Sequence, residues 1–165
     1  MTASPGPSAT VSLTFVPDPA YVRTVRLVAA AAARRAGVSD DLLDEVRLAT
    51  GEACARAVAL HRRLGVDDMI AVAMTGGTRF TICVTDRGPA DDAEREPGED
   101  TGDILAQVAA ESGRLAMDEE VLSAGVGLAL LQGVVSDLAV GASSDGQGTE
   151  IRMSWPVQRR PRGPA

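Results

Sequence analysis

The alternation of hydrophobic and polar residues along this chain predicts five β-strands. Residues 11–17, 69–75 and 79–86 place an apolar side chain at nearly every second position, and two shorter runs follow at 138–143 and 149–155. The tripeptide "GGT" between the second and third runs is typical of a β-hairpin turn, and "SDGQG" separates the last two runs. The pattern therefore predicts two pairs of consecutive antiparallel strands and one strand that precedes them.

A helical pattern, with apolar residues three or four positions apart, fills the space between the first two strands. The first predicted helix covers residues 18–37, where Asp18 is a candidate N-cap and Gly37 a natural stop. The second is expected to be capped by Ser39 and to end near Gly65.

The segment from Arg87 to Ser123 differs from the rest of the chain, because it is acidic and contains several prolines and glycines. We expect a long loop there, with a short helix over "ILAQVAAE", and loops of this length are usually functional or mobile. Residues 125–137 then form a glycine-rich entry to an apolar helix. The resulting order, β-α-α-β-β, loop, α-β-β, predicts an α+β fold with an antiparallel or mixed sheet and helices on one face.

The length of 165 residues suits one domain, which we place at residues 11–156, between tails at 1–10 and 157–165 that we expect to be disordered. Hydrophobic residues make up 45% of the chain, enough for a core, but aromatic residues only 2%, too few for a surface that stacks nucleic-acid bases. The formal net charge of −7 also disfavours direct binding of DNA or RNA. A basic protein partner or a small ligand fits this composition better.

The N-terminus lacks the basic and apolar regions of a signal peptide, and the longest apolar run is too short to span a bilayer. We therefore expect a cytoplasmic protein that does not bind membranes. Cys54 and Cys83 are interpreted as small buried hydrophobes rather than a disulfide. With His61 as the single histidine, no Cys/His zinc site is expected.

Two motifs could hold a ligand, and each has an ordinary structural alternative. In "TDRGPADD" (85–92) an aspartate at a strand end, followed by glycine, could accept a hydrogen bond from an amine, but the same residues favour a turn. In "GVGLAL" (125–130) the backbone N–H groups at a helix start could bind phosphate, although a flexible start to a core helix explains them equally.

Two further motifs are weaker when taken alone. "DGQGTEIRM" (145–153) is by itself a hairpin turn and a strand. In "EACAR" (52–56) the side chains of Glu52 and Arg56 are four residues apart on one helix face. They form either an ordinary surface ion pair or an altered catalytic site.

In this order, the four motifs resemble those of the GHKL ATPase family, over residues 10–155. Within that family the chain is most similar to the small bacterial anti-sigma factors that are serine-protein kinases, the RsbW/SpoIIAB type. The resemblance implies a two-layer α/β sandwich of the GHKL ATP-binding (Bergerat) type, with a mixed sheet and helices on one face. It also implies that ATP or ADP lies between helices and sheet, under a lid formed by residues 87–124.

By this resemblance, Glu52 corresponds to the acid that activates the attacking group, and Asp86 to the carboxylate that receives the adenine amine. The other residues that the resemblance assigns to the nucleotide site are Gly88 beside Asp86, then Gly125, Gly127 and Leu128 on the phosphate side, and Gly148 and Thr149 near adenine.

The chain departs from the family pattern at two positions. Arg56 stands where the family's E-x-x-x-N motif has the asparagine that holds Mg²⁺, and arginine has only hydrogen-bond donors and a fixed positive charge. We therefore expect no metal ion held in the family's usual way, and predict that Arg56 contacts phosphate or pairs with Glu52. Ala90 replaces the second glycine of D-x-G-x-G, a milder change.

These features favour an anti-sigma-like regulatory protein that acts by binding a sigma factor or a STAS-type anti-anti-sigma protein, with weak or lost use of Mg-ATP. A homodimer is compatible with the sequence. One alternative is an active ATP-dependent serine kinase that phosphorylates the STAS-type protein, and another is a nucleotide-binding module without a sigma partner. A complete histidine kinase is disfavoured, because the single histidine, His61, lies inside the same domain.

Overall fold

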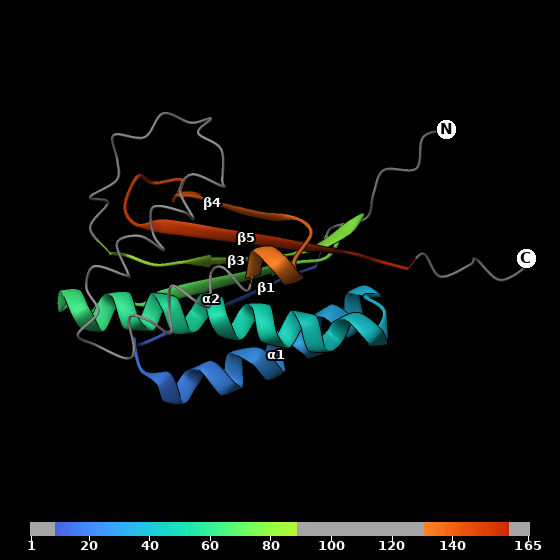
Figure 1. Ribbon diagram of the computed structural model, residues 1–165, viewed down its shortest axis with the longest axis horizontal. Helices are drawn as coiled ribbons and strands as arrows, with labels where there is room; N and C mark the ends of the chain where they lie inside the picture. The colour runs from blue at the N-terminus through green and yellow to red at the C-terminus, as the bar shows by residue number, and fades with distance from the viewer. Residues whose placement is uncertain (1–8, 89–130, 159–165) are drawn as a thin grey trace, which may run out of the picture.

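The computed structural model of the protein describes residues 9–88 and 131–158, which form two layers. One layer is a five-stranded sheet, and helices α1 and α2 lie side by side against one of its faces (Figure 1). The strands are β1 (Thr10–Phe15), β2 (Ile70–Thr75), β3 (Arg79–Thr85), β4 (Leu138–Ala142) and β5 (Thr149–Pro156). The helices are η1 (Pro19–Tyr21), α1 (Val22–Ala36), η2 (Asp40–Leu42) and α2 (Leu43–Leu64), and residues 131–134 are also helical.

The strand order in the sheet is β1-β2-β3-β5-β4, and every described pair of neighbours is antiparallel. The predicted α+β class and all five predicted strands are confirmed. The sheet is not mixed in the described part of the chain, because hairpins join β2 to β3 and β4 to β5. The β3–β5 pair brings together segments on either side of residues 89–130, so the two hairpins form one sheet.

The helix ends follow the predicted signals with one exception. The Asp18 carboxylate accepts a hydrogen bond of 2.8 Å from the backbone N–H two residues later. Gly37 and Gly65 end α1 and α2 in the left-handed conformation. Ser39 does not cap the second helix as predicted, because its hydroxyl donates to the side chain of Asp41 and the chain first forms the short helix η2. None of the described helices has the length and apolar character needed to cross a membrane.

The core lies between the helices and the inner face of the sheet, and alanines fill much of the helical side. Small side chains let the helices approach the sheet closely, which suits a chain with so few aromatic residues. Trp155 is buried, and its indole N–H donates to the carboxylate of Glu45 at 2.7 Å. Cys54 is fully buried as predicted, and this burial raises the pKa of its thiol to about 12.

The outer face of the sheet carries small and polar side chains. Ser12, Ala73, Cys83 and Arg152 lie opposite one another in one row across four strands. Cys83 is therefore a half-buried residue of this outer face and not the core residue that the sequence predicted. Partial burial and the neighbouring Glu150 raise the pKa of its thiol. Both cysteines are free thiols.

The last described residues still contact the domain. Val157 packs against the core, and the backbone N–H of Gln158 donates to the carbonyl of Gly37 at 2.8 Å. The C-terminal segment thus continues past the end of β5 toward the end of α1.

Two alanines of α1 give a matched test of this packing. Ala33 is fully buried and Ala31 is exposed. We expect Ala33→Leu to lower the free energy of unfolding by about 1–3 kcal/mol, because the added carbons have no space. Ala31→Leu should change it by less than about 0.5 kcal/mol. Urea denaturation of both variants measures the difference, and equal effects would contradict the described packing of α1.

Candidate functional site

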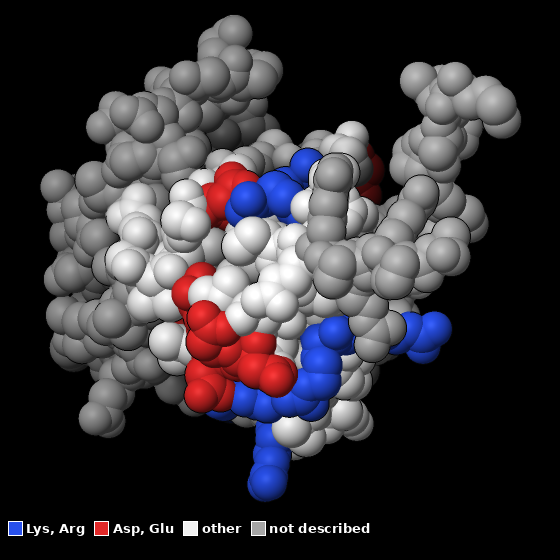
Figure 2. All heavy atoms as spheres, turned by 90° about the vertical axis from the view of Figure 1, so that its right-hand side faces the viewer, with Lys and Arg blue, Asp and Glu red and all other residues white. Residues whose placement is uncertain are grey.

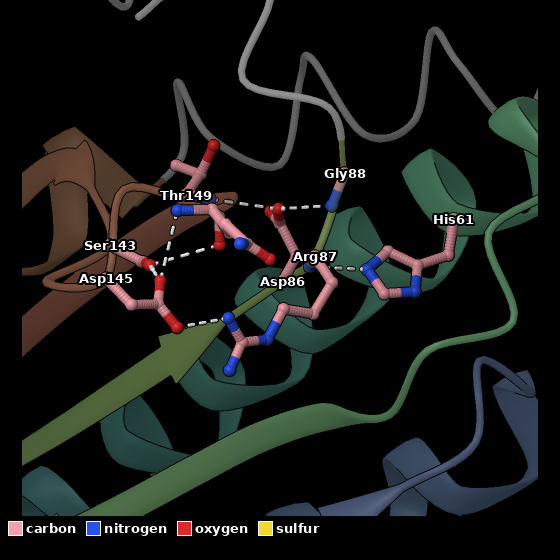
Figure 3. Close-up of polar contacts among 8 residues, drawn as sticks. His61, Asp86, Arg87, Gly88, Ser143, Asp145 and Thr149 are labelled. Carbon is pink, nitrogen blue, oxygen red and sulfur yellow. Dashed lines mark hydrogen bonds and ion pairs between the residues drawn. The ribbon is translucent and has the colours of Figure 1, made fainter.

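Asp86 follows the end of β3, and its buried carboxylate organises one end of the sheet. The backbone pairing of β3 with β5 continues one residue further, since the N–H of Asp86 donates to the carbonyl of Thr149 at 3.0 Å. The side-chain oxygen Oδ1 of Asp86 accepts the N–H of Thr149 at 3.1 Å and that of Gly88 at 3.2 Å (Figure 3). The carboxylate is 2% exposed, so these backbone donors replace the water that it loses.

Arg56 reaches the same carboxylate from α2. Its Nη1 lies 3.1 Å from Oδ2 of Asp86, and the two side chains are 15% and 2% exposed. The predicted contact of Arg56 with Glu52 is therefore wrong, because its guanidinium pairs with Asp86. The predicted contact of Arg56 with phosphate stays a prediction. The buried charge of Asp86 needs a partner more than the half-exposed Glu52 does. Within the described residues Glu52 makes no ion pair or hydrogen bond.

This arrangement leaves little room for a ligand amine at Asp86. A carboxylate offers roughly four acceptor positions, and three of them are filled by Arg56, Gly88 and Thr149. A nucleotide base could use Asp86 as the family resemblance implies only at the fourth position, on Oδ2 beside Arg56, or by displacing Arg56. The described residues thus leave one acceptor position on Asp86 for an adenine amine.

The other predicted site residues divide into two groups. Gly88, Gly148 and Thr149 gather around Asp86, as described above and below. Four residues lie outside the described part of the chain, namely Ala90, Gly125, Gly127 and Leu128. No cluster of three or more His, Cys, Asp or Glu side chains in residues 9–88 and 131–158 is placed to hold a metal ion.

Gly148 allows the backbone of the turn before β5 to touch the backbone of Asp86. Its φ of 96° lies in the left-handed region, and a Cβ there would be 2.0 Å from the carbonyl oxygen of Asp86. At Gly88 a Cβ would meet Leu60 at 2.8 Å, a contact that a flexible side chain relieves more easily. Gly148, which the family resemblance placed near adenine, is therefore needed for the packing of the protein itself.

Arg87 connects this strand end to the turn between β4 and β5. The sequence did not predict this connection. Its guanidinium forms an ion pair with Asp145 (Figure 3). Asp145 also accepts from the Ser143 hydroxyl and from the N–H of Gln147. The hydrogen bond from Ser143 and then the contact with Arg87 hold the pKa of Asp145 well below its ordinary value.

His61 fixes the same segment from the side of the helix, and it is fully buried. Its Nε2 accepts the backbone N–H of Arg87 at 2.8 Å (Figure 3). Its Nδ1 lies 3.1 Å from the carbonyl oxygen of Asp68. A backbone N–H can only donate and a carbonyl can only accept, so the ring is neutral with its proton on Nδ1. One feature of the sequence indicates that His61 is buried. His61 lies four residues after Ala57, so it continues the face of α2 on which Ala57 is buried.

The comparison with known protein families agrees with this fold. The sequence model of the histidine kinase-like ATPase domain matches residues 15–155, which is most of the chain. The chain belongs to this family. No curated protein sequence matches it. The protein is thus a histidine kinase-like ATPase domain in which Arg56 neutralises the aspartate at the end of β3.

Gly148 and Gly146 separate the cost of backbone conformation from the cost of close approach. Both have positive φ, but a Cβ at Gly146 meets nothing within 4 Å. We expect Gly146→Ala to cost about 1 kcal/mol of folding free energy, because of its φ alone. Gly148→Ala should cost at least about 2 kcal/mol, since the end of β3 must also move. Chemical denaturation compares the two, and equal losses would show that the contact with Asp86 is unimportant.

The lowered pKa of Asp145 predicts a pH dependence of stability. A carboxyl whose folded pKa is lowered stabilises the fold fully above its unfolded pKa, which is 3.8, and loses this effect as the pH falls below that value. The stability difference between wild type and Asp145→Asn should therefore be largest at neutral pH and shrink below about pH 4. Denaturation at several pH values measures it, and a constant difference would mean that the Asp145 charge does not stabilise the turn.

Proposed function

We propose that this histidine kinase-like ATPase domain is an anti-sigma-like regulator that acts by binding a protein partner, with weak or lost use of Mg-ATP. The observation that carries the proposal is the buried ion pair between Arg56 and Asp86. It occupies one acceptor position of the carboxylate that the family resemblance assigns to a base, and it places a fixed cation where the family has a metal ligand.

The ion pair acts against phosphoryl transfer in two ways. A guanidinium cannot coordinate Mg²⁺, and phosphoryl transfer depends on metal ions to neutralise the developing charge. A ligand amine at Asp86 has one acceptor position left, beside Arg56. If the amine displaced Arg56 instead, separating the buried pair would cost roughly 3–5 kcal/mol when one charge is left without a partner. Nucleotide binding is weak when this free energy must be subtracted from it.

The proposed partner is a sigma factor or a STAS-type anti-anti-sigma protein in the cytoplasm. Support for it comes from the order of the four sequence motifs, which resembles that of the small anti-sigma factor kinases. The family match to residues 15–155 supports the ATPase domain alone. Partner binding does not require that the nucleotide site work. The protein could bind as a monomer or as a homodimer.

The second candidate is an active serine kinase that phosphorylates the STAS-type protein. One observation favours it. Glu52 is half-exposed on α2 and has no ionic partner within the described residues, so its carboxylate could act as a general base. The two candidates differ in whether the transfer of phosphate is observed at all.

The substitution Arg56→Asn tests the role of the ion pair. It frees Oδ2 of Asp86 and restores the family's motif, so we expect ATP affinity to rise by at least about tenfold and to become dependent on Mg²⁺. The wild type should bind ATP weakly and almost independently of Mg²⁺. Isothermal titration with ATP and ADP, with and without Mg²⁺, measures both. Arg47→Asn is the control, because Arg47 lies on the same helix and pairs with the exposed Asp44 instead.

A phosphate-transfer assay with labelled ATP and a STAS-domain protein from the same genome can contradict the proposed function. Under the proposal, wild type transfers no phosphate, and Glu52→Ala leaves partner binding intact. Robust Mg²⁺-dependent transfer by the wild type, lost in Glu52→Ala, would overturn the proposal and establish the kinase.

A further inference from the structure

The outer face of α1 carries positive charge only. The helix contains Arg23, Arg26, Arg34 and Arg35 and no acidic residue. All 16 basic residues of the chain are arginines, whose planar guanidinium pairs with carboxylates through two hydrogen bonds. An arginine-rich helix on an acidic protein calls for an explanation, because a net charge of −7 makes such a surface unexpected.

Four exposed residues of α1 follow one another at intervals of four, and we call them the arginine–leucine stripe. They are Arg23, Leu27, Ala31 and Arg35. Neighbouring residues at this spacing lie on the same face, and each step turns by about 40°, so the four residues form an inclined stripe about 18 Å long. Leu27 is 59% exposed, the highest value among the exposed large hydrophobic residues of the described chain. The stripe thus has an apolar centre with an arginine at each end.

The arginines at the two ends of the stripe contribute little to folding. Arg23 is in the first turn of α1, where the helix dipole disfavours a positive charge. Within the described residues neither Arg23 nor Arg35 forms an ion pair, whereas the adjacent Arg34 pairs with Asp40. Two charges without a structural role therefore flank the exposed leucine.

The net charge of the chain does not describe this surface. Residues 89–130 contain eleven of the 23 acidic residues and only two of the 16 arginines. Figure 2 shows one face of the molecule, on which basic side chains lie along the lower edge and near the top, each next to acidic side chains. The acidic excess of the chain thus comes from residues 89–130, and the expectation of a basic partner from net charge does not apply to α1.

We propose that the arginine–leucine stripe is the docking surface for an acidic segment of a protein partner, in which an apolar side chain lies between carboxylates. Leu27 and the shallow position at Ala31 receive the apolar side chain, and Arg23 and Arg35 pair with the carboxylates. The proposal rests on the function proposed above, since it identifies how the regulatory partner is held.

A protein fits this surface better than the other anionic partners. A nucleic acid or an anionic membrane carries many phosphates over a wide area and would be repelled by the acidic remainder of the chain. Membrane binding by a helix also needs a broad apolar face, whereas this stripe has one large apolar residue. A few carboxylates at fixed positions match the local charge without requiring a basic protein as a whole.

The first test measures the affinity of the full chain for each sigma factor and STAS-domain protein of the same genome. For the protein that binds, we expect Arg23→Glu and Leu27→Ser each to weaken binding by about tenfold or more. Arg152→Gln, on the outer face of the sheet, should change it by less than about twofold, whereas Arg23→Gln should weaken it measurably. Because Arg23→Glu suits the helix dipole, its melting temperature should not fall, which separates lost docking from lost folding. Unchanged affinity in the stripe variants would overturn the proposal.

A second test is independent of the regulatory partner. An NMR titration uses a helical peptide with one leucine between two glutamates on one face, its lysine counterpart, a short DNA duplex, and anionic phospholipid vesicles. We expect shifts along the stripe with the glutamate peptide only, absent in Arg23→Glu. Shifts elsewhere, or tighter binding of DNA or vesicles, would overturn the docking surface. If the glutamate peptide binds but no sigma factor or STAS protein does, the proposed function is wrong, whereas the proposed docking surface is supported.

Discussion

The end of the sheet depends on a single buried charge. Asp86 is almost completely removed from water, and burying a carboxylate is costly unless donors replace the lost hydration. The donors come from three separate parts of the chain. Arg56 belongs to α2, Thr149 begins β5, and Gly88 follows Asp86 in the chain. One carboxylate therefore joins the helical layer to both hairpins of the sheet.

Backbone contacts around this charge limit how far the site can change shape. Gly148 places the turn before β5 directly against the carbonyl of Asp86, and His61 holds the next N–H, that of Arg87, through its neutral ring. The exposed ion pair of Arg87 with Asp145 adds a weaker tie to the same turn. The strand end is thus fixed by the protein itself, without help from a ligand. A site that needs a ligand to complete its hydrogen bonds would lack these internal partners.

The sequence predicted the elements well and their contacts less well, for reasons that individual residues show. Strands and helices follow from local periodicity, and Gly37 and Gly65 are stop signals that act within one turn. The partner of Arg56 lies 30 residues away, so a rule based on neighbouring helix positions pointed to Glu52 instead. Whether the sheet is mixed or antiparallel depends on how β3 and β5 pair across residues 89–130, which periodicity does not report. Cys83 was misplaced because an apolar-looking strand position can face either side of a sheet.

The arginine–leucine stripe and the Asp86 site are connected through one structural element, α2. The stripe lies on the outer side of α1, and Asp86 lies at the end of the sheet, so no described residue belongs to both. The helices nevertheless pack closely where a Cβ on Gly51 of α2 would lie 2.8 Å from the side chain of Arg26 of α1. Gly51 is five residues before Arg56 on the same helix. A shift of α1 on docking would therefore press on the helix that carries the counter-ion of Asp86. Among the described elements, α2 contacts both the helix of the stripe and the carboxylate of Asp86, so it is the element that connects the two sites.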